Sequence, residues 1–244
     1  MSASAERRDP EPELAFLEGI EAGRTELDPG ELDDLFEGVR GRVEKSGARR
    51  LNALAEQPTS RRRLFALACC ALIVVGLGAL LPHSNQPLPP LALGAIFGSF
   101  GVLLVVAVVI AFRPIYVPAL SPVWKIGLGV AAVAAAVSVA LVPELHAHLT
   151  ARPAEGAFLG KALPCLSFGL LAGLPGYVFL RLLDRGAPFG PLLAGVAAGL
   201  AANMVLELRC PVGGAEHLMF GHAMVVVAFV VGVALLERLV LRRA

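Results

Sequence analysis

Two cysteines and two histidines in the second half of the chain offer side chains for metal binding or redox chemistry. They are Cys165, Cys210, His217 and His222, and Glu216 directly precedes the first histidine. Thiolates and imidazoles are ligands that zinc and copper prefer in proteins. A cysteine pair that faces an oxidising compartment can instead form a disulfide. The residue types therefore indicate a signal-sensing site of redox or metal type, and they leave the identity of any bound metal ion open.

The spacing of the two histidines argues against a simple helical metal motif. His217 and His222 are five residues apart in the chain, which corresponds to about 140° around an α-helix. Two residues on one face of an α-helix are normally three or four positions apart. The sequence therefore predicts that the two histidines do not share a face, and an ordinary packing role for them stays open.

The other candidate residues carry less chemistry. The four cysteines have no Cys-x-x-Cys spacing, so they indicate neither a zinc finger nor a disulfide framework. Cys69 and Cys70 are expected to be packing residues, and His146 and His148 lie in a predicted loop. No His-Glu-x-x-His, Gly-x-Ser-x-Gly or paired-carboxylate pattern lies in or near an apolar segment, so we expect that the protein is not an enzyme.

The elements that must position these residues are apolar helices. Hydrophobic residues make up 56% of the 244 positions and charged residues 17%, against about 45–50% and about 25% in soluble domains. The sequence predicts an all-α fold, a six-helix transmembrane bundle over residues 64–244 that follows a polar arm over residues 1–63. Each predicted span is bounded by charge or proline, and the spans are 64–81, 91–112, 126–142, 157–180, 191–206 and 218–236.

The distribution of basic residues predicts the orientation of these spans. Ten lysines and arginines flank the spans on the side of the arm, and three lie on the opposite side. Because cytoplasmic segments are enriched in these residues, both termini are predicted to be cytoplasmic, in a multi-pass protein of the bacterial inner membrane. The two candidate cysteines and two histidines then lie toward the outer side. The spans have no Asp, Glu or Lys near their middle, which counts against a transporter.

The polar arm has a pattern of its own. Residues 1–44 hold 13 acidic and 5 basic side chains, whereas residues 45–63 hold one acidic and six basic ones. A helix is predicted to begin at Asp28-Pro29, and its apolar face consists of Leu32, Leu35, Phe36, Val39 and Val43. Short amphipathic helices are marginal alone, so we expect this face to bind a protein partner. The membrane surface and pairing with a second helix of the arm are the alternatives.

The last third of the chain contains a distinctive series of motifs. They are Arg185-Gly186-Ala187-Pro188, Pro191, Ala194-Gly195, Ala198-Gly199, Ala201, Leu208-Arg209-Cys210-Pro211, His217 and His222. This series resembles the NrsF family, six-span proteins that act as negative regulators of extracytoplasmic-function sigma factors, and the resemblance is best over residues 163–229. It implies that Cys165 and Cys210 take part in signalling, and that the cytoplasmic N-terminal arm holds the sigma factor. The long acidic arm departs from the short arm typical of that family.

These observations lead to one preferred function and one alternative. The preferred function is a membrane-bound anti-sigma factor that sequesters an extracytoplasmic-function sigma factor and releases it on an envelope, redox or metal signal. An acidic arm with an apolar face suits the basic, DNA-facing surface of a sigma factor, and no direct contact with nucleic acid is expected. The alternative is a small membrane transporter or a metal-handling permease.

Overall fold

The structure is a computed structural model that describes residues 53–54, 56–80, 89–114, 117–118, 120–142, 158–184 and 190–241. The chain divides into two units, residues 1–50 and 51–244, and all the described residues belong to the second. The arm helix predicted to begin at Asp28-Pro29, with its apolar face from Leu32 to Val43, therefore lies outside the described residues. The loop histidines His146 and His148 lie outside them as well.

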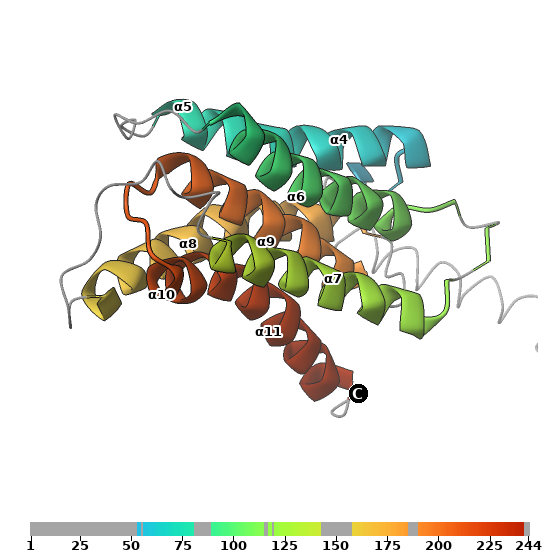
Figure 1. Cartoon of the computed structure of the whole chain (residues 1–244). Coiled ribbons are helices and arrows are strands. Elements are labelled where there is room, and N and C mark those ends of the chain that lie inside the picture. Colours follow the sequence, from blue (N-terminus) through green and yellow to red (C-terminus); the bar gives the residue numbers. More distant parts are fainter. Residues whose placement is uncertain are drawn as a thin grey trace, which may run out of the picture. The chain divides into compact units, whose positions relative to one another are not determined.

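Six helices within the described residues are long and apolar enough to cross a membrane (Figure 1). This confirms the prediction of an all-α, multi-pass membrane protein. The spans are Thr59–Leu80, Pro90–Ala111, Pro122–Leu141, Gly160–Leu183, Gly190–Arg209 and Ala215–Leu236.

The first span begins earlier than the sequence predicts. It starts at Thr59 rather than at residue 64, so it includes the three arginines at positions 61–63. Long basic side chains can reach from the end of a membrane helix to polar groups nearby, so arginines are tolerated in the first turns. The span is built from three consecutive segments, the middle one π-helical: α4 (Thr59–Leu72), η1 (Ile73–Leu77) and α5 (Gly78–Leu80).

Two arginines near the start of this span form hydrogen bonds with the ends of two other helices. Arg63 Nε donates to the carbonyl of Phe112 at 2.9 Å, at the end of α6 (Pro90–Ala111). Arg62 donates to the carbonyl of Leu183 at 3.3 Å, the last residue of α8 (Phe158–Leu183). The last carbonyls of a helix have no partner within the helix, so these arginine side chains satisfy them.

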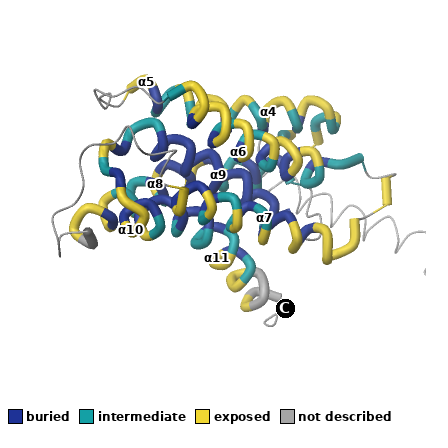
Figure 2. Tube along the Cα trace, viewed as in Figure 1, coloured by how far each residue is buried: buried dark blue, intermediate teal, exposed yellow. Residues whose placement is uncertain are grey.

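The centre of the bundle is α9 (Gly190–Arg209), which is buried along nearly its whole length (Figure 2). Its sequence is rich in glycine and alanine, and small side chains let neighbouring helices approach closely. A Cβ atom at Gly195 would lie 2.9 Å from the backbone oxygen of Phe229, and one at Gly199 would lie 3.2 Å from the Phe229 Cβ. The Gly-x-x-x-Gly pair therefore packs α9 against α11 (Met224–Leu241) within one chain, while α6, α7 (Pro122–Leu141) and α8 surround the rest of α9.

The last span also contains a π-helical segment. It consists of α10 (Ala215–Leu218), η3 (Met219–Ala223) and α11. Gly214, which precedes α10, has a φ of 124°, a conformation that favours glycine, and it lets the chain turn back into the membrane after α9. This tight return brings η3 close to the ends of α8 and α9.

Candidate metal and thiol centre

The structure brings together all four residues that the sequence singled out as a candidate sensing site. Cys165 comes from α8, Cys210 directly follows α9, His217 lies in α10 and His222 in η3. The possible ligand atoms of these four side chains all lie within 4.8 Å of one another. Both histidines are fully buried, with 0% and 1% exposure, and Cys210 is buried as well. We call these four residues the Cys2His2 cluster.

The prediction that the two histidines do not share a face is wrong. Their rings stand edge to face with centroids 5.4 Å apart. The backbone between them is π-helical over Met219–Ala223, and hydrogen bonds in a π-helix link residues five positions apart. Residues five apart therefore come one above the other, which an α-helix would prevent. Single π-helical turns are frequent at functional sites, and this one aligns His217 with His222.

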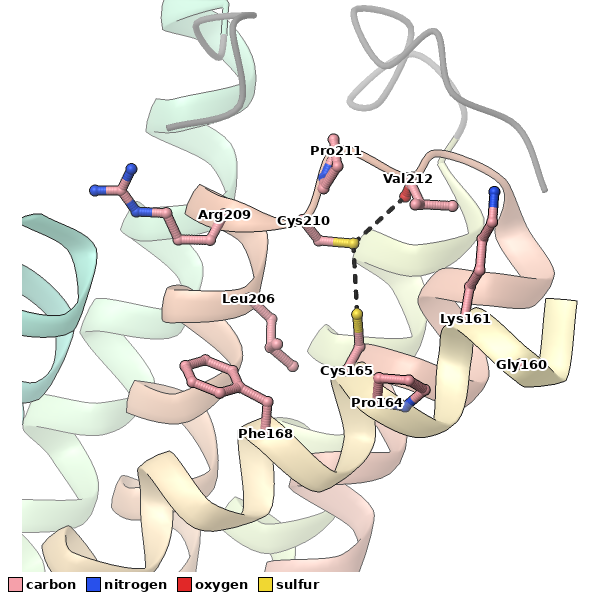
Figure 3. A pocket seen from close by; sticks show the side chains of 10 residues that line it. All are labelled: Gly160, Lys161, Pro164, Cys165, Phe168, Leu206, Arg209, Cys210, Pro211 and Val212. Carbon is pink, nitrogen blue, oxygen red and sulfur yellow. Dashed lines mark hydrogen bonds between the residues drawn. The ribbon is translucent and has the colours of Figure 1, made fainter. Parts of the chain in front are cut away.

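The sulfur and nitrogen atoms of the cluster are in direct contact. The Cys165 and Cys210 sulfur atoms are 3.6 Å apart (Figure 3). Cys210 Sγ also lies 3.1 Å from Nε2 of His217. Zinc bonds sulfur at about 2.3 Å and nitrogen at about 2.0 Å, so ligands around one tetrahedral ion lie about 3.3–3.8 Å apart. The two separations of 3.6 and 3.1 Å are close to that range, and the other pairs of donor atoms lie within 4.8 Å. Two cysteines and two histidines are also a donor set that zinc and other thiophilic ions take.

Glu207 is a part of the site that the sequence analysis missed. Its carboxylate oxygen Oε1 lies 2.9 Å from Nδ1 of His222, and both side chains are 2% exposed. Histidines that bind a metal usually donate their second ring nitrogen to a carboxylate, which fixes the tautomer and the ring orientation. In the sequence alone, Glu207 is only one of the charged residues at the end of the fifth span. Its position three residues before Cys210, on the same helix face, is the signal that could have identified it.

Two buried ring nitrogens of the cluster have no hydrogen-bond partner among the described residues. They are Nε2 of His222 and Nδ1 of His217. A buried polar atom without a partner costs about 1–3 kcal/mol, so such atoms mark a missing ligand or a functional constraint. With Nδ1 of His222 facing Glu207, its Nε2 is the nitrogen left for a metal ion. The donor set, the separations and the carboxylate thus fit a metal ion at this position.

The protonation of Cys210 bears on how such an ion would bind. Cys210 lies just outside the fifth span, and its hydrogen bond with Cys165, followed by its burial, raises the pKa of its thiol. Its proton must leave before the sulfur can bind a metal ion as a thiolate. Metal binding here would therefore release protons. The two sulfur atoms, at 3.6 Å and not bonded, are also close enough to form a disulfide after a small movement.

A pocket of about 480 Å³ opens beside the two sulfur atoms. Figure 3 shows its lining residues on α8 and around the end of α9, with Cys165 and Cys210 side by side in its wall. Phe168 and Leu206 form its deeper, apolar part. The pocket thus leads to the sulfur side of the cluster, whereas both histidines are buried behind it.

The other cysteine pair does not belong to the cluster. Cys70 is buried with the core residues of the bundle, and Cys69 is half-buried. No other group of three or more metal-binding side chains is found among the described residues. The packing role expected for this pair is consistent with these surroundings.

Comparisons with protein-family models, with curated proteins and with solved structures found no match for this chain. The resemblance to the NrsF family therefore stays a prediction from the sequence. The geometry of the Cys2His2 cluster and of the helices that hold it is the basis of the proposed function.

Proposed function

We propose that the protein is a membrane-bound anti-sigma factor whose input is a thiophilic metal ion bound by Cys165, Cys210, His217 and His222. The convergence of four donor side chains from three segments, three of them buried and Cys165 half-buried, is the observation that supports this most. Packing alone gives no reason for a carboxylate to orient His222 while the opposite ring nitrogen has no partner in the described part of the chain.

The metal ion would supply ligand bonds that join α8, the end of α9 and the start of the last span. The chain's own residues prepare these bonds. Glu207 accepts a hydrogen bond from the protonated Nδ1 of His222. This bond directs the Nε2 atom of His222 toward the sulfur atoms. On binding an ion, the two thiols would release their protons to water. A ligand shifts a protein between two states only if it binds them differently, and an ion that needs all three segments meets that condition.

The output would pass through the cytoplasmic ends of the helices. The positive-inside pattern supports an extracytoplasmic cluster and a cytoplasmic arm. Helix α8 carries Cys165 near one end, and its last carbonyl, at the other end, accepts the Arg62 hydrogen bond. Arg62 lies at the junction between the acidic part of the arm, residues 1–44, and the first span. A movement of α8 would therefore reach the start of the first span, and through it the acidic arm that we propose holds an extracytoplasmic-function sigma factor.

A redox signal at the same site is the second candidate, because the two sulfur atoms are 3.6 Å apart. The two inputs make different demands on the histidines. A disulfide needs the cysteines alone, whereas a metal ion needs His217 and His222 as well. Replacing both histidines by glutamine therefore separates them: loss of the response supports metal, and a retained response supports oxidation.

The test is capture of soluble proteins from membranes that contain a tagged full-length chain, with and without added Zn²⁺ or Cu⁺. We expect a sigma factor to be retained by the full chain and lost when residues 3–44 are deleted. Its retention should change with metal for the native cluster and not for C165S/C210S. If no soluble protein is retained by the full chain under any condition, the anti-sigma function is wrong. Metal flux into proteoliposomes would then favour the permease.

A further inference from the structure

The pocket beside the cluster has a marked charge preference. Lys161 and Arg209 are among its lining residues, and the described part of the lining contains no acidic side chain. Figure 3 shows the two cations on opposite sides of the cysteine pair, with the guanidinium of Arg209 directed away from the sulfur atoms. Within the described part of the chain, neither cation forms a salt bridge, and Nε of Arg209 is buried without a hydrogen-bond partner. The mouth of the pocket is thus suited to an anion.

The deeper part of the pocket is suited to a hydrocarbon chain. Phe168 and Leu206 line it one turn further into the membrane than Cys165 and Cys210. The two cations, in contrast, stand at the ends of two spans, since Gly160–Leu183 begins next to Lys161 and Gly190–Arg209 ends at Arg209. Lipid headgroups lie at this level of a bilayer, and acyl chains lie at the level of Phe168. A pocket of about 480 Å³ has room for part of an acyl chain.

We propose that this pocket binds an anionic phospholipid, with its headgroup at the cationic mouth and an acyl chain against Phe168 and Leu206. Three features of the pocket favour this lipid. They are the charge of its mouth, its apolar deeper part and its position at the bilayer boundary. A zwitterionic phospholipid would offer the same chain without the net charge that attracts the two cations.

A bound lipid would also cover the sulfur atoms. Cys165 and Cys210 line the same pocket, and the histidines behind them are fully buried, so among the described residues the pocket is the open route to the cluster. Lipid binding itself does not depend on the proposed function. Its consequence for regulation does rest on that function: a lipid in the pocket would slow the arrival of a metal ion at Cys165 and Cys210.

The experiment uses the full chain, free of metal, in nanodiscs of phosphatidylcholine alone or of phosphatidylcholine with an equal amount of phosphatidylglycerol. Native mass spectrometry of the released protein counts retained phosphatidylglycerol. The rate at which N-ethylmaleimide alkylates Cys165 and Cys210 reports how far the sulfur atoms are covered. We expect a retained phosphatidylglycerol and slower alkylation in its presence. Each cation contributes about a fivefold factor in affinity, so K161Q/R209Q should remove both effects, whereas R113Q should not.

A second pair of variants tests the pocket rather than the charge. A Cβ atom at Gly160, which lines the pocket, or at Gly94, on α6, would meet nothing within 4 Å. At both positions a side chain can therefore begin without a clash at its Cβ atom. Gly160→Trp should fill the pocket and displace the lipid, and Gly94→Trp is the matched control that should leave it bound.

The outcomes distinguish the alternatives. Equal alkylation rates in the two nanodiscs, or unchanged lipid retention in K161Q/R209Q and Gly160→Trp, would overturn the proposal. Retention of a quinone or another neutral molecule in place of phosphatidylglycerol would overturn it too. Zinc binding measured in detergent without phosphatidylglycerol tests the metal site separately, so failure of one proposal leaves the other intact.

Discussion

The chain contains two pairs of cysteines, and they differ in a way that residue type alone does not reveal. Cys69 and Cys70 are neighbours in the sequence, yet in the described structure they belong to no group of three or more metal-binding side chains. Cys165 and Cys210 are 45 residues apart, yet their sulfur atoms are separated by 3.6 Å. The difference lies in their surroundings. Two histidines and a carboxylate accompany the second pair, and the first packs among apolar side chains.

The sharpest test of this comparison is removal of each pair in turn. Cys165→Ser or Cys210→Ser removes one of four ligands, and we expect at least a hundredfold loss of zinc affinity, measured by competition with a chromophoric chelator. The matched control, C69A/C70A, should keep the native affinity. Equal losses of zinc affinity from changes in the two cysteine pairs would contradict a metal site that uses Cys165 and Cys210 and not Cys69 and Cys70.

The next largest effect concerns Glu207. Glu207→Gln keeps the size of the side chain and removes the charge that holds the proton on Nδ1 of His222. Loss of such a carboxylate partner typically costs about 10–100-fold in metal affinity, and we expect a value in that range. Glu216→Gln is the control, because Glu216 is exposed and next to His217 in the sequence. An unchanged affinity for Glu207→Gln would mean that the carboxylate does not support the metal site.

Oxidation should separate the two pairs as well. Diamide accepts two electrons and two protons from a pair of thiols, and the close sulfur atoms of Cys165 and Cys210 should form a disulfide readily in the metal-free protein. One equivalent of Zn²⁺ should protect them about tenfold, since bound thiolates are less free to react. Peptide mapping by mass spectrometry would detect the bond. A protein in which zinc gives no protection would speak against cysteine ligation.

The smallest effect concerns the spacing between η3 and α8. A Cβ atom at Gly221 would lie 3.3 Å from the Cβ of Cys165 and 3.4 Å from the backbone oxygen of Ala162. Gly221→Ala should therefore shift the two segments by a few tenths of an ångström and weaken zinc binding about threefold. Gly232→Ala lies in the same span with nothing within 4 Å, so it should have no effect. A larger loss of zinc affinity in Gly232→Ala than in Gly221→Ala would contradict the close approach of η3 and α8.

The elements of this fold that depend on composition could be predicted, and those that depend on local backbone geometry could not. The six spans follow from long apolar segments, because lipid requires closed helical hydrogen bonding. The four cluster residues were identified by their chemistry. The alignment of His217 with His222 was missed, since the sequence gives no sign that Met219–Ala223 is π-helical. Glu207 was missed because a charge at the end of a span looks like a boundary until its burial is known.

The most direct test of the Cys2His2 cluster is zinc X-ray absorption spectroscopy on the full chain loaded with one equivalent of Zn²⁺. We expect two sulfur ligands at about 2.3 Å and two nitrogen ligands at about 2.0 Å, with one nitrogen lost in His222→Gln. A first shell made mainly of oxygen, or a spectrum that C165S/C210S does not change, would contradict the assignment of a metal site to these four residues.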